Sequence, residues 1–188
     1  GELSRQTVTR FVEDSYALLA SRARVQTYLP VLTARFAADR LEALVTSTRR
    51  TSTGPSTDVL FVCVQNSGRS QLAAAALRAR AGAFARVHTA GSAPADRVDP
   101  VVLEVIERRG WVSVLEFPKP LTDEVIRACD VVVTMGCGEA CPVVPGRTYL
   151  DWQVPDPAGQ PVATVDRIAD LVDARVADLL ARLQESDA

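Results

Sequence analysis

The sequence predicts an α/β fold: a four-stranded parallel sheet with helices on both faces, preceded by a small N-terminal helical domain. Two observations indicate this class. From residue 58 onward, short apolar runs alternate with helical patterns, which is typical of parallel strands joined by helices. Residues 1–46 show only helical periodicity, and residues 47–57 contain Gly54-Pro55 but no large apolar side chain. We therefore expect a helical bundle over 1–46, a linker over 47–57 and an α/β domain over 58–188.

The N-terminal residues carry two apolar sets at helical spacing. Members of the first set recur at three- and four-residue steps, which places them on one helix face. The second set surrounds Pro30, which fits near a helix start, and leaves open one helix or two with a break near Ala38. Such short helices bury little area alone, so we expect them to pack on a second copy of the chain or back onto the α/β domain. The two sets are Val8, Phe11, Val12, Tyr16 and Leu19, and Tyr28, Leu29, Leu32, Phe36, Leu41, Leu44 and Val45.

The α/β elements follow from local patterns. Residues 59–64 form an apolar run typical of a strand buried on both faces. Residues 69–81 are rich in Ala and Leu and stop before Gly82, which predicts a helix. Further strands are expected at 87–90, 131–135 and 147–150. Asp99-Pro100 and Thr122-Asp123-Glu124 each begin a helix, and the last helix has an apolar stripe over residues 165–183.

Composition and charge exclude several classes of function. The net charge of −2 and the pI of about 5.5 argue against a protein that binds nucleic acid or an anionic membrane. No apolar run reaches the roughly 18 residues of a membrane span, and the start lacks a signal-peptide pattern. The four cysteines do not resemble a disulfide scaffold in a chain of 188 residues, so we expect a cytoplasmic protein whose cysteines are buried, metal-bound or reactive. They are Cys63, Cys129, Cys137 and Cys141.

The most informative segment follows the first strand and opens the next helix, where α/β proteins bind ligands. A loop at this place directs backbone N–H groups and a helix N-terminus at one point, which suits a tetrahedral oxyanion such as phosphate or arsenate. The segment is Cys63-Val64-Gln65-Asn66-Ser67-Gly68-Arg69-Ser70.

The side chains of this segment fit a nucleophilic cysteine site. The positive field of the loop favours the thiolate of Cys63, which is the nucleophile, and Arg69 can bind two oxyanion oxygens with its guanidinium fork. Ser70 can hydrogen-bond the sulfur, Asn66 can pin the loop through its amide, and Gly68 tolerates backbone angles that other residues do not. The alternative is a buried cysteine at a strand end followed by an ordinary loop.

These motifs resemble the low-molecular-weight tyrosine phosphatase family, in particular its arsenate reductase branch. Residues 62–71 are similar to the nucleophile loop of that branch, residues 90–92 (Ala-Gly-Ser) to the segment after the family's second strand, and Asp156-Pro157 to its general-acid loop. Two departures stand out: Gln65 occupies a position where many relatives have His or Gly, and Ala158 follows Asp156-Pro157 where the phosphatases have an aromatic. Residues 1–46 resemble the helical, dimer-forming extension of some actinobacterial relatives.

The resemblance implies a catalytic domain over 58–188 that reduces arsenate. Cys63 would attack arsenate while Asp156 helps water leave, Cys137 would attack Cys63 and release arsenite, and Cys141 would then take over the disulfide. No bound cofactor is implied. An external thiol reductant, thioredoxin or else mycothiol, would reduce the Cys137–Cys141 disulfide, and residues 1–46 would form a homodimer.

Three alternatives stay open. A phosphatase acting on phosphate monoesters needs only Cys63, Arg69 and Asp156. A non-catalytic, oxyanion-binding dimeric regulator predicts a degenerate site, although these three residues are all present. Metal binding by Cys137 and Cys141 would need further ligands, and only Cys129 and the single His88 remain to supply them, so no metal site is expected.

Overall fold

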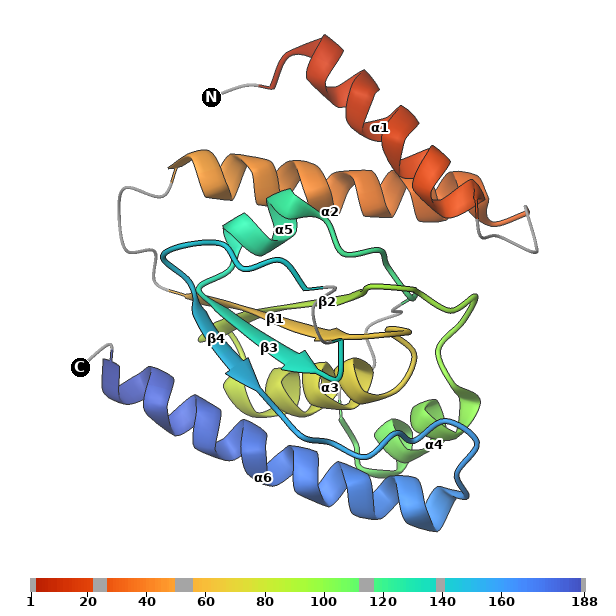
Figure 1. Cartoon of the computed structure of the whole chain (residues 1–188), viewed down its shortest axis with the longest axis vertical. Coiled ribbons are helices and arrows are strands. Elements are labelled where there is room, and N and C mark those ends of the chain that lie inside the picture. The colour runs from red at the N-terminus through yellow and green to blue at the C-terminus, as the bar shows by residue number, and fades with distance from the viewer. Residues whose placement is uncertain (1–2, 22–26, 50–55, 112–116, 138–140, 187–188) are drawn as a thin grey trace.

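The computed structural model describes residues 3–21, 27–49, 56–111, 117–137 and 141–186. Its centre is a four-stranded sheet in the order β2-β1-β3-β4, in which every neighbouring pair is parallel (Figure 1). The predicted fold class is therefore confirmed. No helix within these described ranges combines the length and apolar character that crossing a membrane requires. The strands are β1 (Thr57–Cys63), β2 (Ala85–Gly91), β3 (Val131–Met135) and β4 (Thr148–Asp151).

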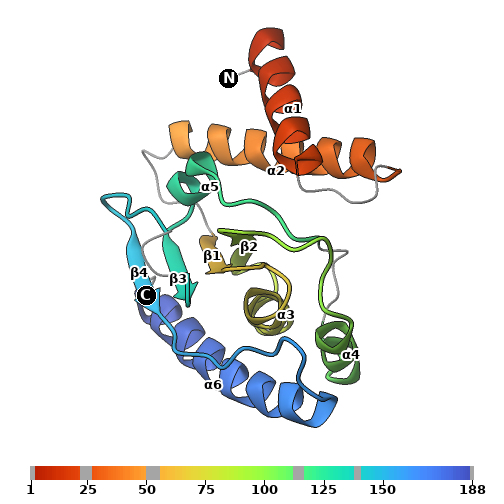
Figure 2. The same ribbon diagram turned by 45° about the vertical axis from the view of Figure 1, so that its right-hand side comes forward.

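Helices cover both faces of this sheet, as expected (Figure 2). Val59 and Phe61 of β1 share one core with α3 (Arg69–Ala81), α4 (Pro100–Arg108) and α6 (Val162–Ser186). Leu60 and Val62 point to the opposite face, because successive side chains of a strand alternate, and share a second core with α5 (Asp123–Ala128). All four side chains are fully buried, which explains why this strand reads as a continuous apolar run.

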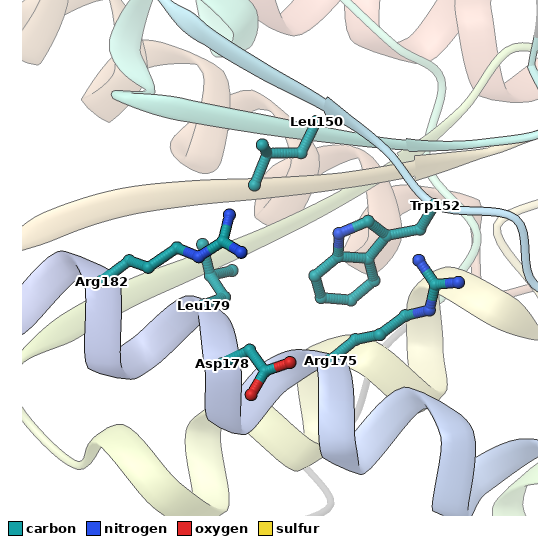
Figure 3. Close-up of a pocket in the computed structure, with 6 residues that line it drawn as sticks. All are labelled: Leu150, Trp152, Arg175, Asp178, Leu179 and Arg182. Atoms are coloured by element: carbon teal, nitrogen blue, oxygen red, sulfur yellow. The ribbon is translucent and has the colours of Figure 1, made fainter.

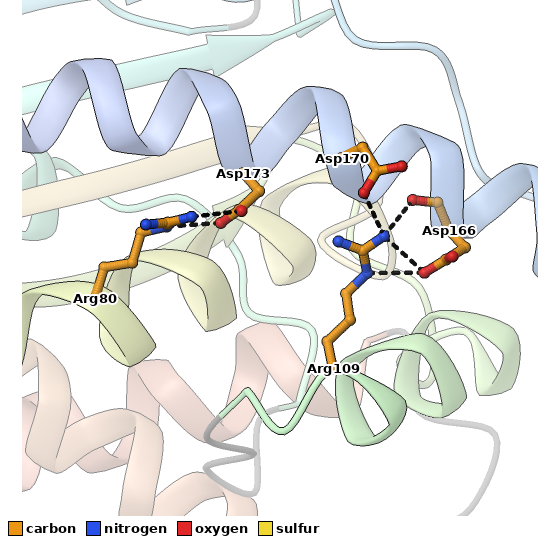
Figure 4. Close-up of polar contacts among 5 residues, drawn as sticks. All are labelled: Arg80, Arg109, Asp166, Asp170 and Asp173. Carbon is orange, nitrogen blue, oxygen red and sulfur yellow. Dashed lines mark hydrogen bonds and ion pairs between the residues drawn. The ribbon is translucent and has the colours of Figure 1, made fainter.

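Ion pairs reinforce the packing of α6 on its neighbours (Figure 4). Arg80 at the end of α3 forms two hydrogen bonds with Asp173. This hydrogen bonding lowers the pKa of the Asp173 carboxyl below its ordinary value. Arg109, just after α4, reaches both Asp166 and Asp170 on α6. These pairs lie at the surface, where each contributes about 0.2–1 kcal/mol, so the apolar core beneath them is the larger stabilising factor.

The N-terminal part consists of α1 (Arg5–Ala20) and α2 (Leu29–Arg49). The second apolar set forms one continuous helix, without a break near Ala38. This helix also runs past residue 46, where the linker was expected to start, because the hydroxyls of Ser47 and Thr48 donate to carbonyls one turn back and are satisfied within the helix. Residues 50–55 of the expected linker lie outside the described residues, and β1 begins at Thr57.

Helix α2 packs onto the α/β domain rather than standing apart from it. Ala43 of α2 belongs to the same buried core as Leu60 and Val62, so α2 covers part of one sheet face together with α5. Arg40 is 6% exposed and forms ion pairs with Asp14 of α1 and Glu124 of α5. One of the two expected packing modes, folding back onto the α/β domain, is thus present in α2.

Helix α1 buries less of its predicted apolar face than the periodicity suggested. Phe11 is buried, beneath the guanidinium of Arg40. In contrast, Val8, Val12 and Tyr16 are 37%, 40% and 49% exposed. These three residues follow one another at four-residue steps and form a stripe on the outside of α1.

A charged cluster lies at the amino end of the sheet, on the opposite edge from the nucleophile loop. Asp58 is 4% exposed and accepts hydrogen bonds from Arg86 at 2.6 and 2.9 Å, and its Oδ1 lies 3.0 Å from His88 Nε2. Burial by itself would raise the pKa of Asp58, but the hydrogen bonds and charges of His88 and Arg86 outweigh it and hold the pKa below its ordinary value. His88 is therefore a packed histidine with a carboxylate partner.

Candidate active site

The carbonyl groups of the loop after β1 accept hydrogen bonds from a neighbouring segment, residues 92–99, and these bonds hold the loop in place. A trans peptide points its C=O and the following N–H in opposite directions, and the chain has no cis peptide bond within the described residues. When the carbonyls of such a loop face outward, the N–H groups of residues 64, 65, 66 and 68 must face inward. The carbonyls of Cys63, Val64, Gln65 and Ser67 accept hydrogen bonds of 3.2, 2.8, 2.9 and 3.0 Å from the N–H groups of Ser92, Ala93, Ala95 and Asp99.

The sulfur of Cys63 lies inside this ring of N–H groups. Cys63 is the last residue of β1 and is 2% exposed. Its Sγ accepts a hydrogen bond of 3.2 Å from the N–H of Asn66 and lies 3.1 Å from the hydroxyl of Ser70. The structure therefore brings together the predicted nucleophile, the predicted loop and the predicted serine partner. A ring of donors around a sulfur stabilises a thiolate and, with it, an oxyanion placed against that thiolate.

The conformational requirements of the loop differ from expectation at one position. The left-handed backbone falls on Asn66, whose φ is 50°, and Gly68 has a negative φ of −131°. Asn tolerates this region better than most residues, and here its side chain is bonded at both ends, to Lys119 and to Ser70. The requirement at Gly68 is space, because a Cβ there would lie 2.6 Å from the ring of Pro157.

That contact seats the expected acid loop against the nucleophile loop. Asp156 directly precedes Pro157, and its Oδ2 lies 3.3 Å from Nη2 of Arg69. The side chain of Asp156 is 58% exposed, so its carboxyl is accessible from the mouth of the site. A carboxyl beside the anion-binding arginine is positioned to deliver a proton to a leaving oxygen.

The guanidinium of Arg69 is confined on its other side by Gly136. A Cβ at Gly136 would lie 2.6 Å from Nη1 of Arg69, and the φ of Gly136 is +74°. A side chain at this position would be strained by the positive φ and would displace the guanidinium of Arg69. Gly136 follows β3 directly, so the end of β3 helps to fix the fork that would hold the oxyanion.

Cys137 is the next residue, and it forms a disulfide with Cys141. Met135 at the end of β3 pairs with Cys63 at the end of β1, so the chain reaches Cys137 two residues beyond the neighbour of the nucleophile. Cys137 is 7% exposed and Cys141 is half-buried. Neither Cys63 nor Cys129 is in a disulfide, and Cys129 is fully buried between α5 and β3, as expected for a core cysteine. Within the described ranges, no three His, Cys, Asp or Glu side chains are grouped to hold a metal ion.

A small pocket lies elsewhere, between β4 and α6 (Figure 3). It has a volume of about 130 Å³, and among its lining residues the guanidinium of Arg175 lies 6.0 Å from the indole of Trp152. None of the nucleophile-loop residues lines it, so it is separate from the site built around Cys63. The indole of Trp152 also packs on Phe61, which makes it part of the core.

Sequence patterns did not identify several residues that shape this site. Gly136 belongs to none of the predicted motifs, and its close approach to the guanidinium of Arg69 joins residues far apart in the chain. Lys119, whose N–H donates to Asn66 Oδ1 at 2.9 Å, carries no motif. Gln71, which donates to the carbonyl of Asn66 at 2.9 Å, lies within the nucleophile-loop motif, and that position was the available signal.

A nucleophilic cysteine at the end of a parallel strand, inside a ring of backbone donors and followed by an arginine that opens a helix, defines the class of cysteine-dependent oxyanion-binding enzymes. Residues 58–188 match the low molecular weight phosphotyrosine protein phosphatase family, and residues 1–45 match the protein-tyrosine-phosphatase-like N-terminal domain. The chain belongs to the low molecular weight phosphotyrosine protein phosphatase family.

Individual relatives narrow the comparison. The solved structure of the thioredoxin-dependent arsenate reductase Cg_ArsC1' of Corynebacterium glutamicum is 43% identical, covers 98% of this chain and 89% of its own, and superposes with a TM-score of 0.88. A Halobacterium salinarum protein, provisionally named an arsenate reductase, is 35% identical over 68% of this chain and 93% of its own length. The glutaredoxin arsenate reductase of a Synechocystis strain is 30% identical over 66% of this chain and 97% of its own length.

Proposed function

We propose that this chain is an arsenate reductase, a thiol-dependent enzyme that converts arsenate to arsenite with Cys63 as its nucleophile. The observation that carries the proposal is the disulfide between Cys137 and Cys141, which lies immediately beyond the strand paired with the end of β1. Hydrolysis of a phosphate ester needs no second thiol, whereas reduction of an oxyanion needs a thiol to accept the oxidising equivalents. The similarity to the Corynebacterium and Synechocystis reductases supports the same assignment.

The first step uses the nucleophile loop. The thiolate of Cys63 attacks the arsenic of arsenate and forms an S–As bond, one As–O bond breaks, and Asp156 supplies the proton with which that oxygen leaves as water. Arg69 and the inward N–H groups of residues 64, 65, 66 and 68 bind the remaining oxygens. Arsenic is still pentavalent at this stage, so no electrons have yet been transferred.

The second and third steps use the other two cysteines. The thiolate of Cys137 attacks the sulfur of Cys63, the electron pair of the S–As bond stays on arsenic, and arsenite leaves as arsenic(III). Cys141 then attacks Cys137, which frees the Cys63 thiolate and leaves the Cys137–Cys141 disulfide. A Cys63 outside any disulfide, together with a Cys137–Cys141 disulfide, corresponds to the end of this reaction sequence.

A two-electron thiol reductant must then regenerate Cys137 and Cys141 as thiols. We propose a thioredoxin for this role, since a dithiol protein can attack one sulfur and resolve the mixed disulfide with its second thiol. Cys141 is more exposed than Cys137, so we expect the reductant to attack the sulfur of Cys141. Mycothiol with a glutaredoxin-like partner is the alternative donor. Such a cycle belongs in a reducing compartment, which supports a cytoplasmic location.

We also propose that α1 forms a homodimer interface. The exposed stripe of Val8, Val12 and Tyr16 is the face that a second copy would cover. Sedimentation equilibrium of the full chain tests this: Val12→Lys should lower the apparent mass from dimer to monomer. Val143→Lys should not, because Val143 is an even more exposed valine that lies outside α1. A monomeric wild type would reject the interface.

The proposed function is tested by arsenate-dependent turnover with a thioredoxin system. The wild type should turn over, the variants Cys63→Ser, Cys137→Ser and Cys141→Ser should each lose activity, and Cys129→Ala should retain it because that thiol is buried away from the site. Activity that survives without Cys137 and Cys141 would point to an external thiol such as mycothiol as the direct partner of Cys63. No arsenate turnover with any thiol, together with brisk hydrolysis of an aryl phosphate, would replace the reductase with a phosphatase.

A further inference from the structure

The segment around Lys119 lies against the end of β2 and contacts the nucleophile loop through its backbone. The N–H of Gly91 donates to the carbonyl of Lys119 at 2.8 Å, and the N–H of Leu121 donates back to the carbonyl of Gly91 at 3.0 Å. Between these two bonds, the N–H of Lys119 donates to Oδ1 of Asn66 at 2.9 Å. These bonds place the Lys119 N–H beside the loop that holds Cys63.

This single bond sets the direction of a chain of hydrogen bonds. A backbone N–H can only donate, so the atom of Asn66 that faces it must be the oxygen, and the opposite end of the amide must be the NH₂ group. That NH₂ group donates to the hydroxyl oxygen of Ser70 at 2.8 Å. The hydrogen of the Ser70 hydroxyl is then directed to its other neighbour, the sulfur of Cys63 at 3.1 Å. Ser70 is fully buried, so this donor cannot be replaced by bulk water.

The opposite direction would have the opposite effect on the sulfur. If the amide presented its oxygen to Ser70, the hydroxyl would donate to the amide and turn its lone pairs toward Cys63. A thiolate only accepts hydrogen bonds, so it would lose one stabilising donor and face a repulsive oxygen instead.

Helix α2 holds the side chain of the same lysine. Nζ of Lys119 forms an ion pair with Oδ2 of Asp39 at 3.2 Å, and the lysine side chain is only 14% exposed. One turn earlier on α2, the guanidinium of Arg35 lies 5.7 Å from the ring centre of Phe117. Nζ of Lys119 lies 5.6 Å from the centre of the same ring. Residues 117–119 are thus clamped by α2, and α2 is itself fastened to α5 by the ion pair of Arg40 with Glu124.

We propose that Asp39 is a positioning residue for the nucleophile: by holding Lys119 it keeps the Lys119 N–H on Asn66, and so directs the Ser70 hydroxyl toward the sulfur of Cys63. The N-terminal helices then contribute to the chemistry of the site although none of their residues touches it. The turnover part of this inference rests on the proposed arsenate reductase activity, but the state of the thiol can be measured without any substrate.

The measurement is the rate at which iodoacetamide alkylates Cys63 in the full-length, oxidised protein, where Cys63 and Cys129 are the free thiols and peptide mass analysis separates them. The rate is measured on the rising part of its pH dependence and expressed as a fraction of the plateau rate at high pH, which reports the share of thiolate. For Asp39→Asn we expect this fraction to fall about two- to fivefold, the range set by an ion pair of this exposure. The charged groups at the mouth of the loop, Arg69 and Asp156, are unchanged.

The sign of the effect separates positioning from direct electrostatics. Removing a negative charge near a thiolate favours the thiolate, so a purely electrostatic role of Asp39 would raise the alkylation rate. A lower rate is expected only if Asp39 acts through Lys119 and the hydrogen-bond chain. The exchanged pair Asp39→Lys with Lys119→Asp keeps the backbone N–H and the ion pair, and should restore most of the loss.

Two further variants complete the test. Asp173→Asn breaks another partly exposed ion pair between helices, with Arg80, and should leave the alkylation of Cys63 unchanged. In a Ser70→Ala background the chain is already cut, so Asp39→Asn should have no additional effect. The proposal is overturned if Asp39→Asn leaves the rate unchanged or raises it, if it lowers the rate equally with and without Ser70, or if Asp173→Asn lowers it as much. Failure of arsenate turnover in the wild type would reject the proposed function and leave these thiol measurements valid.

Discussion

Replacing Gly136 by alanine should impair oxyanion binding through Arg69 rather than through loss of the fold. The new Cβ would lie 2.6 Å from Nη1 of Arg69, a distance that real Cβ contacts do not show, so the guanidinium must move. A φ of +74° adds strain of about 1–2 kcal/mol for a residue with a Cβ. Gly146 offers a matched control, because its φ is +78° and a Cβ there would meet nothing within 4 Å.

The expected effect on activity follows from the hydrogen bonds that Arg69 would lose. Each hydrogen bond between charged groups contributes about 1.5–3 kcal/mol, and about 1.4 kcal/mol corresponds to a factor of ten in rate. If one arm of the guanidinium fork no longer reaches the oxyanion, kcat/KM for arsenate should fall by about 10- to 150-fold.

The assay compares steady-state arsenate reduction, inhibition by inorganic phosphate and urea unfolding for Gly136→Ala, Gly146→Ala and the wild type. Both variants should lose a similar amount of stability, since both force a side chain into the left-handed region. Only Gly136→Ala should lose kcat/KM and bind phosphate more weakly. Equal arsenate kinetics for the two alanine variants, with both proteins folded, would refute the role assigned to the contact between Gly136 and Arg69.

Two predictions concern stability. Asp58→Asn should cost about 1–2 kcal/mol at pH 7, because the buried carboxylate accepts from Arg86 and His88 and the first of these partners is half exposed. The pKa of Asp58 is lowered on folding, so its contribution to stability is complete above the ordinary pKa of 3.8 and is lost as the pH falls below that value. In urea unfolding at a series of pH values, the difference in unfolding free energy between wild type and variant should therefore disappear in that acid range. A difference that stays constant with pH would contradict the assignment. Arg40→Met should cost about 2–4 kcal/mol in urea unfolding, since it leaves the largely buried carboxylate of Glu124 without its partner. A loss below about 0.5 kcal/mol would mean that apolar contacts alone fasten the N-terminal helices.

Local patterns in the sequence predicted most elements of the α/β domain with little error. The helix over Arg69–Ala81 and the strand over Val131–Met135 have the predicted bounds, because each is defined by apolar spacing and a neighbouring stop or start signal. Asp99 caps its helix by accepting from the N–H of Val101, as its position before a proline indicated. The end of α2 was the main misjudged boundary, since Ser47 and Thr48 were predicted as part of a linker but form hydrogen bonds inside the helix.

The nucleophile loop could also be predicted from the sequence, because its reactive and binding residues are consecutive in the chain. A cysteine at a strand end and an arginine at the following helix start are close in the chain, so the sequence indicates that they share one anion site. The sequence by itself therefore determined the fold class and the presence of further cysteines after the strand at 131–135, and it predicted Cys63 and Arg69 as partners in one site.

Only the tertiary structure decided how that site is supported. The seat of Pro157 on Gly68, the contact of Gly136 with Arg69 and the bond from Lys119 to Asn66 each join segments that are far apart in the chain. Contacts of this kind leave no periodicity and no local motif, since either partner alone is an ordinary glycine, proline or lysine. The docking of α2 on the sheet face had the same origin: its apolar spacing required some partner, and the packing of the folded chain determined which one.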